Sequence, residues 1–383
     1  MHDTAPSTPA TPPQAGTPLH VLLVCPDGTD DARLKQTGTF ALSLHACGVA
    51  VSVLVGNRDT SPLSGLGGKL RVTHAAPSPW LWTPPLVTEF RQLLASDPTI
   101  DIVHLMDVRW PAPLLGPVAT RLNVPTVGRL HAEADLTTDG LAFWNSRRAL
   151  QGLACLRPMV VSTGHLLEQA RKVGHTQVCL IPDGVNVDQF RPVLSKRPLR
   201  RELGLPEKAT LVCCMASLDP ANKQLETLHQ CMPLGEHVQL VLIGPVRNPD
   251  YRDTLKGEAA RLGVRDWVHI LEPVSNPEDY LKACDLFMLL GGIEERITTV
   301  LEAQSAGLPV VLGPSPSALT LTNGNRCGVV LYPNNLLAER AFQRLLSDPI
   351  YRQNRSVNAR PHVKKDFPFA RMMQDYLRLY HSL

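Results

Sequence analysis

Short apolar runs alternate with segments of helical periodicity along the chain from residue 19 onward. In the first half, runs such as LHVLLVC at 19–25 and VSVLV at 51–55 are rich in β-branched residues, and helix-like segments such as FALSLHAC at 40–47 separate them. Continuous apolar strands joined by helices are typical of a parallel sheet that helices cover on both faces. The first half therefore predicts a doubly wound α/β domain.

The same alternation restarts after an arginine-rich stretch, FRPVLSKRPLRREL at 190–203. The runs that follow include TLVCCM at 210–215, VQLVLIG at 238–244 and PVVLG at 309–313. A chain of 383 residues is also too long for one ordinary domain. We therefore predict an α/β fold of two Rossmann-like domains that face each other across a cleft. Ligands of such sheets bind at the carboxyl ends of the strands, so a nucleotide-sized ligand is expected there.

The predicted domain boundaries follow from these patterns. Residues 1–17 are Pro, Thr, Ala and Ser with almost no large apolar side chain, which predicts a disordered tail. The first Rossmann-like domain is predicted at 18–187 and the second at 208–362, with a linker at 188–207.

Composition and charge narrow the function classes. The chain is 44% apolar and 19% charged, which excludes global disorder. The net charge of +3 gives no reason to expect a nucleic-acid partner. No apolar run reaches the length of a bilayer span, and no signal-peptide pattern precedes the first domain, so we expect a cytoplasmic protein. The nine cysteines lie mostly in apolar runs, without CxxC pairs or metal-ligand spacing, so no metal site is predicted.

The segment DLFMLLGGIEERITTVLEAQSAGLPVV, residues 285–311, carries the most chemical information. A strand runs into a Gly-Gly loop, and a helix then begins around Ile297. Glu294 lies in the loop and Glu302 lies eight residues later in the helix, so both carboxylates can face a ligand along one wall. Open backbone N–H groups at the helix start would meet a phosphate. Spacing alone favours the alternative interpretation, in which Glu294 caps a helix and Glu302 is solvated.

This segment resembles the signature of glycosyltransferase family 4, retaining enzymes of the GT-B fold, in which E-G-F-G-x-x-x-x-E-A precedes A-x-G-x-P-V-V. Glu294, Glu302 and the run AGLPVV at 306–311 match that signature without a gap. The resemblance implies that Glu294 contacts the donor sugar and that Glu302 contacts the ribose hydroxyls of a nucleotide-sugar donor.

Other parts of the chain support the resemblance, which covers residues 18–383. IPDGVNVDQFRP at 181–192 is similar to the family's I-P-N-G-V-D motif, and VQLVLIGP carries Gly244 at a strand end. The resemblance implies that His131 lies near the transferred sugar, whereas His104 is expected to be a packed, hydrogen-bonded histidine. It also implies that a C-terminal helix at 363–383 crosses back onto the first domain.

Three departures from the family pattern affect the donor site. The motif G-R-L-x-x-x-K appears as ASLDPANK, with Ser217 in place of the arginine, while Lys223 keeps the second cation. Asp31 and Ala32 replace two glycines of the first loop. Ile297 stands where the signature has a glycine. Arg296 could supply the missing cation at the helix start, or it could form a salt bridge with Glu294 or Glu295; the residues alone leave both open.

The resemblance thus predicts a retaining, hexosyltransferase-type enzyme that uses a UDP-, GDP- or ADP-sugar and needs no cofactor or metal. A front-face mechanism is expected, because no carboxylate nucleophile stands in the expected place. We assign catalysis to His131, Lys223 and Glu294. The predicted donor-binding residues are Ser217, Lys223, Gly244, Arg296, Ile297, Thr298 and Glu302.

Two alternatives stay open, namely a degenerate protein of this fold that acts as a binding or partner subunit, and a nucleotide-sugar epimerase. The acceptor is not identified, and a homo-oligomer or a partner glycosyltransferase is allowed. Trp80 and Trp82 in SPWLWTPPL could contact the inner face of a membrane peripherally, although a loop anchored by buried tryptophans is the favoured interpretation.

Overall fold

The computed structural model describes residues 18–26, 31–56, 71–74, 85–109, 112–132, 143–232 and 235–383. The predicted N-terminal tail and the two tryptophans at 80 and 82 lie outside these residues. The described residues divide into two compact units, one within Met1–Arg129 and Thr137–Met159 and the other within Leu130–Leu136 and Val160–Leu383. The domain boundaries and the linker at 188–207 stay a prediction from the sequence.

The first sheet has seven strands in the order β3-β2-β1-β4-β5-β6-β7. Its central strand β1 pairs in parallel with β2 on one side and with β4 on the other. β1 and β2 are buried from their second residue onward, as continuous apolar runs in a covered parallel sheet should be. The strands are β1 His20–Cys25, β2 Ala50–Val55, β3 Arg71–His74, β4 Ile102–Leu105, β5 Thr126–Leu130, β6 Met159–Val161 and β7 Val178–Leu180.

The second sheet has six strands in the order β10-β9-β8-β11-β12-β13. Here β8 is central and pairs in parallel with β9 and β11. In each sheet the chain adds strands first on one side of the central strand and then on the other, so the strand order reverses between β1 and β4 and between β8 and β11. The strands are β8 Thr210–Met215, β9 Val238–Ile243, β10 Val268–Leu271, β11 Leu286–Leu289, β12 Val310–Leu312 and β13 Gly328–Val330.

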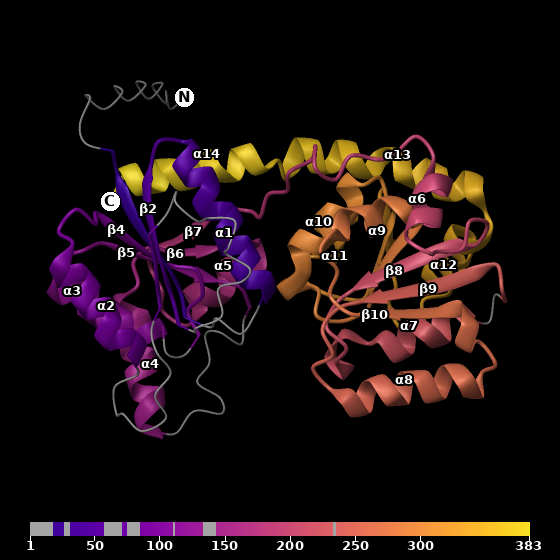
Figure 1. Ribbon diagram of the computed structural model, residues 1–383, viewed down its shortest axis with the longest axis horizontal. Helices are drawn as coiled ribbons and strands as arrows, with labels where there is room; N and C mark the ends of the chain where they lie inside the picture. Colours follow the sequence, from indigo (N-terminus) through magenta and orange to yellow (C-terminus); the bar gives the residue numbers. More distant parts are fainter. Residues whose placement is uncertain are drawn as a thin grey trace, which may run out of the picture. The chain divides into compact units, whose positions relative to one another are not determined.

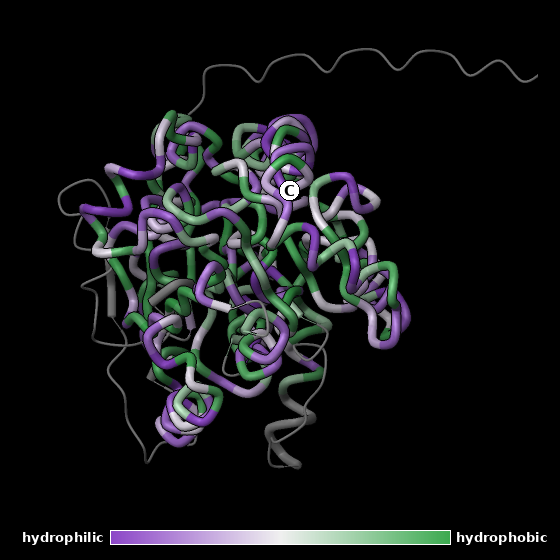
Figure 2. Tube along the Cα trace, turned by 90° about the vertical axis from the view of Figure 1, so that its right-hand side faces the viewer, coloured by the Kyte–Doolittle hydropathy of each residue, from purple (hydrophilic) through white to green (hydrophobic). Residues whose placement is uncertain are grey.

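Helices cover both faces of each sheet. α1 lies on one face of the first sheet and α2 and α3 on the other, whereas α7 and α8 lie opposite α9 and α10 on the second (Figure 1). These helices are α1 Asp31–Ala46, α2 Pro85–Ser96, α3 Leu115–Arg121, α7 Gln224–Cys231, α8 Pro249–Arg261, α9 Pro277–Ala283 and α10 Ile297–Ser305. The other helices are α4 Phe143–Cys155, α5 Gly164–Lys172, α6 Lys196–Glu202, α11 Ala318–Leu321, α12 Leu336–Ser347, α13 Pro349–Asp366 and α14 Phe369–His381. Apolar and hydrophilic stretches alternate along the chain accordingly (Figure 2).

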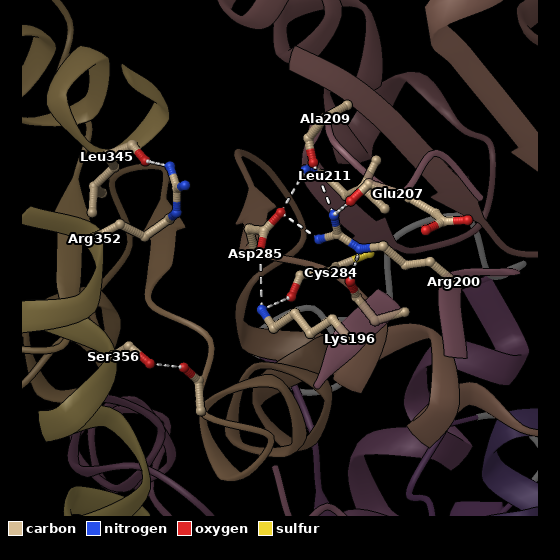
Figure 3. A network of polar contacts seen from close by, with 12 residues as sticks. Lys196, Arg200, Glu207, Ala209, Leu211, Cys284, Asp285, Leu345, Arg352 and Ser356 are labelled. Carbon is tan, nitrogen blue, oxygen red and sulfur yellow. Dashed lines mark hydrogen bonds and ion pairs between the residues drawn. The ribbon is translucent and has the colours of Figure 1, made fainter. Parts of the chain in front are cut away.

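A buried charge cluster ties α6 to the amino ends of β8 and β11 (Figure 3). Arg200, only 5% exposed, donates to the carbonyls of Ala283 and Ala209 and reaches the Asp285 carboxylate at 2.6 Å. The same carboxylate accepts from Lys196 at 3.1 Å and from the backbone N–H of Leu211 at 2.9 Å. Burial alone would raise the pKa of Asp285, but the charges of Lys196 and Arg200 outweigh it and hold the pKa below its usual value.

The C-terminal segment forms two helices where the sequence predicted one helix over 363–383. α13 continues to Asp366, and α14 begins at Phe369 after Pro368. The break follows from Pro368, which lacks a backbone N–H and disfavours helical geometry in the residue before it. At the break, Val185 donates to the carbonyl of Phe367 and accepts from the N–H of Phe369.

Candidate functional site

The predicted donor residues gather where the strand order of the second sheet reverses. Ser217 follows β8, Gly244 follows β9, and the loop from Gly291 to Arg296 follows β11, so all three segments leave carboxyl ends of neighbouring parallel strands. This position is the usual ligand site of an open α/β sheet. The structure therefore brings together residues that are up to 79 positions apart in the sequence.

Gly244 allows the loops after β9 and β8 to touch. A Cβ atom at Gly244 would lie 2.2 Å from the carbonyl oxygen of Ala216 and 3.1 Å from the backbone nitrogen of Ser217, so no side chain fits here. Ser217 is 4% exposed. The residue in the place of the family's arginine thus lies inside the fold, and its side chain contacts protein groups.

Lys223 lies at the start of α7 in a left-handed conformation, with φ of +57°. Its side chain is exposed, and its backbone carbonyl accepts from the N–H and hydroxyl of Thr227. A Cβ atom at Gly291 would lie 3.1 Å from Cγ of Lys223 and 2.1 Å from the carbonyl oxygen of Ala221. The absence of a side chain at Gly291 therefore lets the loop after β11 press against the turn that carries Lys223.

Arg296 reaches across to the segment after β8. Its Nη2 donates to Oγ of Ser217 at 3.0 Å, and its Nε lies 3.4 Å from Oδ1 of Asn222. The guanidinium thus contacts the residue that stands in place of the family's arginine, although it comes from the loop after β11. These contacts fit the sequence-based idea of a replacement cation.

Glu294 begins the 3-10 turn Glu294–Arg296 and binds the residue that precedes α11. One carboxylate oxygen accepts from the N–H of Ser317 at 3.0 Å, and the other accepts from its hydroxyl at 2.7 Å. The capping alternative considered for Glu294 therefore describes a real contact. Because a carboxylate offers about four acceptor sites, this contact still leaves capacity for a ligand.

Glu302 lies in α10 and is half-buried. Burial, with a smaller contribution from the like charge of Glu278, raises the pKa of Glu302 to about 8. Its half-buried position differs from the fully solvated side chain of the alternative. A carboxyl group with a raised pKa, in the helix that follows a strand-end loop, is a candidate ligand-binding group.

The two remaining donor-site predictions lie at the start of α10, the helix that was predicted to begin around Ile297. Ile297 is 4% exposed and packs into the core of this unit, whereas Thr298 is half-buried. Ile297 thus contributes its backbone to the helix start, and its side chain serves packing. Asp31 and Ala32 are the first two residues of α1, which covers the first sheet, and the structure does not describe their side chains.

The two histidines of the first sheet differ in position. His131 is half-buried and directly follows β5, at the carboxyl end of that strand. His104 is fully buried within β4 and packs edge-on against Phe40, with ring centroids 5.7 Å apart. The predicted packing of His104 is confirmed, and its hydrogen bonding stays a prediction.

Sequence reasoning missed two buried amides in the site. Asn222, which is 5% exposed, and Gln224, which is fully buried, both donate to the carbonyl of Ser217, at 2.9 and 2.7 Å. Their neighbour Asp219, followed by Pro220, marks the turn in the sequence, because Asp and Pro commonly start a helical turn. That signal predicts the turn but not which side chains point inward.

Within the described ranges, no group of three or more His, Cys, Asp or Glu side chains could hold a metal ion. All nine cysteines lie within the described residues, and none of them forms a disulfide. No described helix has the length and apolar character that crossing a bilayer requires.

Comparison with known proteins supports the predicted resemblance. Residues 195–362 match the family model of glycosyl transferases group 1. The D-inositol 3-phosphate glycosyltransferase of Streptomyces scabiei is 25% identical over 251 residues, which cover 60% of this chain and 56% of that protein. A GDP-mannose-dependent alpha-(1-6)-phosphatidylinositol monomannoside mannosyltransferase of Mycobacterium tuberculosis is 32% identical over 162 residues, 39% of this chain and 42% of that protein. The chain thus spans about half the length of these relatives.

The fold has known counterparts. The structure of Anabaena Alr3699/HepE in complex with UDP-glucose superposes with a TM-score of 0.81 at 18% identity and covers 95% of this chain and 100% of that one. The two-sheet α/β fold predicted from the sequence is confirmed. The chain accordingly has the GT-B fold, and its residues 195–362 match the family model of glycosyl transferases group 1.

Proposed function

We propose that this protein transfers a sugar from a nucleotide-sugar donor to an acceptor. One observation carries the proposal: Ser217, Lys223, Gly244 and Arg296 converge at the carboxyl ends of β8, β9 and β11, inside the segment that matches the family model. Two cations beside the amino-terminal ends of α7 and α10 suit a diphosphate, since helix starts present unpaired N–H groups to anions.

We assign the other site residues by the same logic. Glu302 receives the ribose hydroxyls, and Glu294, held by Ser317, contacts the donor sugar. Thr298 and the backbone of Ile297 lie at the helix start where the phosphates would dock. Nucleotide-sugar binding by a protein of the same fold, in complex with UDP-glucose, supports this class of donor.

For the reaction we propose transfer with retention by a front-face mechanism, as in family 4. The bond between the sugar carbon and the diphosphate oxygen breaks, the acceptor oxygen bonds to that carbon on the same face, and the leaving oxygen takes the acceptor's proton. Lys223 and Arg296 would stabilise the departing charge, which typically lowers the barrier by about 3–4 kcal/mol per preorganised group. We assign His131 to the sugar end of the site, with no bound metal or cofactor.

We further propose a cytoplasmic enzyme, because cysteines without disulfides are typical of a reducing compartment. The relatives' names include D-inositol 3-phosphate and phosphatidylinositol monomannoside. For this chain we propose a hydroxyl acceptor that the first sheet selects, and a lipid-linked acceptor would bring peripheral contact with a membrane.

The test is a transfer and hydrolysis assay with UDP-, GDP- and ADP-sugars, preceded by a thermal-shift screen that finds the donor base. A ligand at 100 times its dissociation constant adds about 2.7 kcal/mol of stability. We expect turnover with one donor class and at least a hundredfold loss in Lys223→Ala. Lys256→Ala, an exposed change on α8, is the control and should keep full activity.

One observation favours a second candidate, a partner subunit without catalysis. Ser217 and Ile297, which replace the family's arginine and glycine, are both buried and committed to internal contacts. A wild-type protein that binds a nucleotide sugar but neither transfers nor hydrolyses it would establish this second function instead.

A further inference from the structure

Side chains of three segments form one buried polar network at the candidate donor site. The Asn222 amide nitrogen donates to the carbonyl of Ser217 at 2.9 Å and to its hydroxyl at 3.2 Å, and Gln224 donates to the same carbonyl. Buried amides cost free energy unless their partners are satisfied, so a network of this kind is expected to have a definite role.

The network fixes the orientation of Asn222. Its amide nitrogen is committed to Ser217, so the amide oxygen must face Nε of Arg296, which can only donate. Ser217 completes the triangle, because its hydroxyl oxygen accepts from both Asn222 and Arg296. An aspartate at 222 would have the same shape but no N–H for Ser217.

The backbone of the facing loop is adapted to this amide. Gly292 has φ of +62°, a backbone conformation that residues with a side chain rarely adopt. A Cβ atom there would lie 2.4 Å from Oδ1 of Asn222. The loop that carries Arg296 therefore approaches the amide as closely as its backbone allows. The loop after β11 and the turn that carries Asn222 therefore pack together, and the Arg296 guanidinium lies where they meet.

The position of this unit indicates what the guanidinium serves. Arg296 directly precedes α10, and its partner Asn222 lies two residues before α7, so the guanidinium stands beside the starts of two helices. A fixed cation beside two helix starts is a site for phosphate oxygens.

We propose that Asn222 is a positioning residue, which aligns Arg296 for the diphosphate of the nucleotide donor through the shared contact with Ser217. The inference rests on the proposed function in identifying the anion as a diphosphate. It adds that Arg296, which lies in the loop after β11 and not after β8, depends on the buried amide of Asn222 for its alignment.

The test uses inorganic pyrophosphate as the probe, because it needs neither the donor base nor turnover. Calorimetry on the full chain should show binding, with affinity about tenfold or more lower in Arg296→Ala and about tenfold lower in Asn222→Ala. In Arg296→Ala, the further change Asn222→Ala should have little effect, because the residue acts through the arginine. Lys256→Ala is the matched surface control.

A structural role for Asn222 gives a different pattern. Losses that add in the double variant, or wild-type affinity in Asn222→Ala, overturn the proposal, as does a wild-type protein that binds no pyrophosphate. If Asn222→Ala does not fold, Asn222→Asp decides: its carboxylate should neutralise Arg296 and weaken binding, and unchanged affinity would contradict the idea. Coupled pyrophosphate binding without sugar transfer would instead refute the proposed function and leave this inference intact.

Discussion

Glu302 should couple nucleotide binding to the release of a proton. Burial, together with the nearby Glu278, raises the pKa of Glu302 to about 8. At pH 7 about one molecule in ten would then carry the ionised carboxylate, which is the form that accepts two ribose hydroxyls. Binding at pH 7 must therefore deprotonate the rest, which weakens the apparent affinity about tenfold relative to pH 9, or about 1.4 kcal/mol.

Calorimetry can measure this coupling with whichever of UDP, GDP or ADP stabilises the protein. The readout is the ratio of wild-type to Glu302→Gln affinity from pH 6 to 9, because the ratio cancels the titration of the nucleotide itself. We expect the ratio to rise about tenfold between pH 7 and 9. Glu278→Gln removes the like charge and should move this rise to lower pH. A ratio that is constant across the range would refute the assignment of Glu302 to the ribose.

Stability without ligand should show the opposite trend. A carboxyl whose pKa is raised in the folded state contributes stability that is fully present below its unfolded pKa, near 4.5, and is lost as the pH rises through about 8. A full shift would correspond to nearly 5 kcal/mol. Because Glu302 is only half-buried, solvent screening reduces this contribution. We therefore expect the difference in free energy of unfolding between Glu302→Gln and wild type to shift by about 2 kcal/mol in favour of the variant from pH 4.5 to pH 9.

Three further predictions concern other parts of the second unit. Arg200→Met should lower the free energy of unfolding by about 3–5 kcal/mol in urea titrations at pH 7, because it leaves a buried carboxylate short of a partner. Since the pKa of Asp285 is lowered, that deficit should shrink as the pH falls below about 4, and a deficit that grows instead would contradict the sign. Gly292→Ala should cost about 1–3 kcal/mol and also weaken pyrophosphate binding, whereas loss of stability alone would separate the loop from the site. Ser217→Arg should restore part of the activity lost in Arg296→Ala, and no recovery would show that the two positions are not equivalent.

The sequence predicted the strands and α10 well, because their signals are local. Runs such as HVLLVC and TLVCCM are β-branched and uninterrupted, and burial on both faces of a parallel sheet requires that composition. The start of α10 at Ile297 followed in the same way from a Gly-Gly loop before an apolar helical pattern.

The division between α13 and α14 was missed for a physical reason. Few residues of α13 are buried and Pro361 lies inside it, so its sequence lacks the apolar period that defines a helix. Pro368 was the sequence signal for the break between α13 and α14.

The missing parts of the site depend on contacts between distant segments. Nothing in the run ANKQ predicts that Asn222 and Gln224 turn inward, because their partner Ser217 is fixed by the path of the chain after β8. The contact between Arg296 and Ser217 spans 79 positions, and the sequence could suggest it only as one of two alternatives. The resemblance predicts which residues belong to the site, whereas their hydrogen bonds depend on the folded path of the chain.

The charge cluster around Arg200 and the candidate donor site occupy opposite ends of the same two strands. Asp285 precedes β11 and Arg200 binds the backbone before β8, whereas Ser217 and Gly291 follow those strands. A mutation that adds stability at the amino ends therefore need not disturb ligand contacts at the carboxyl ends. Since most changes of specificity cost stability, this separation lets stability gained at the amino ends offset changes of ligand preference at the carboxyl ends. In directed evolution, stabilising α6 first should widen the set of tolerated substitutions in the loops after β8 and β11.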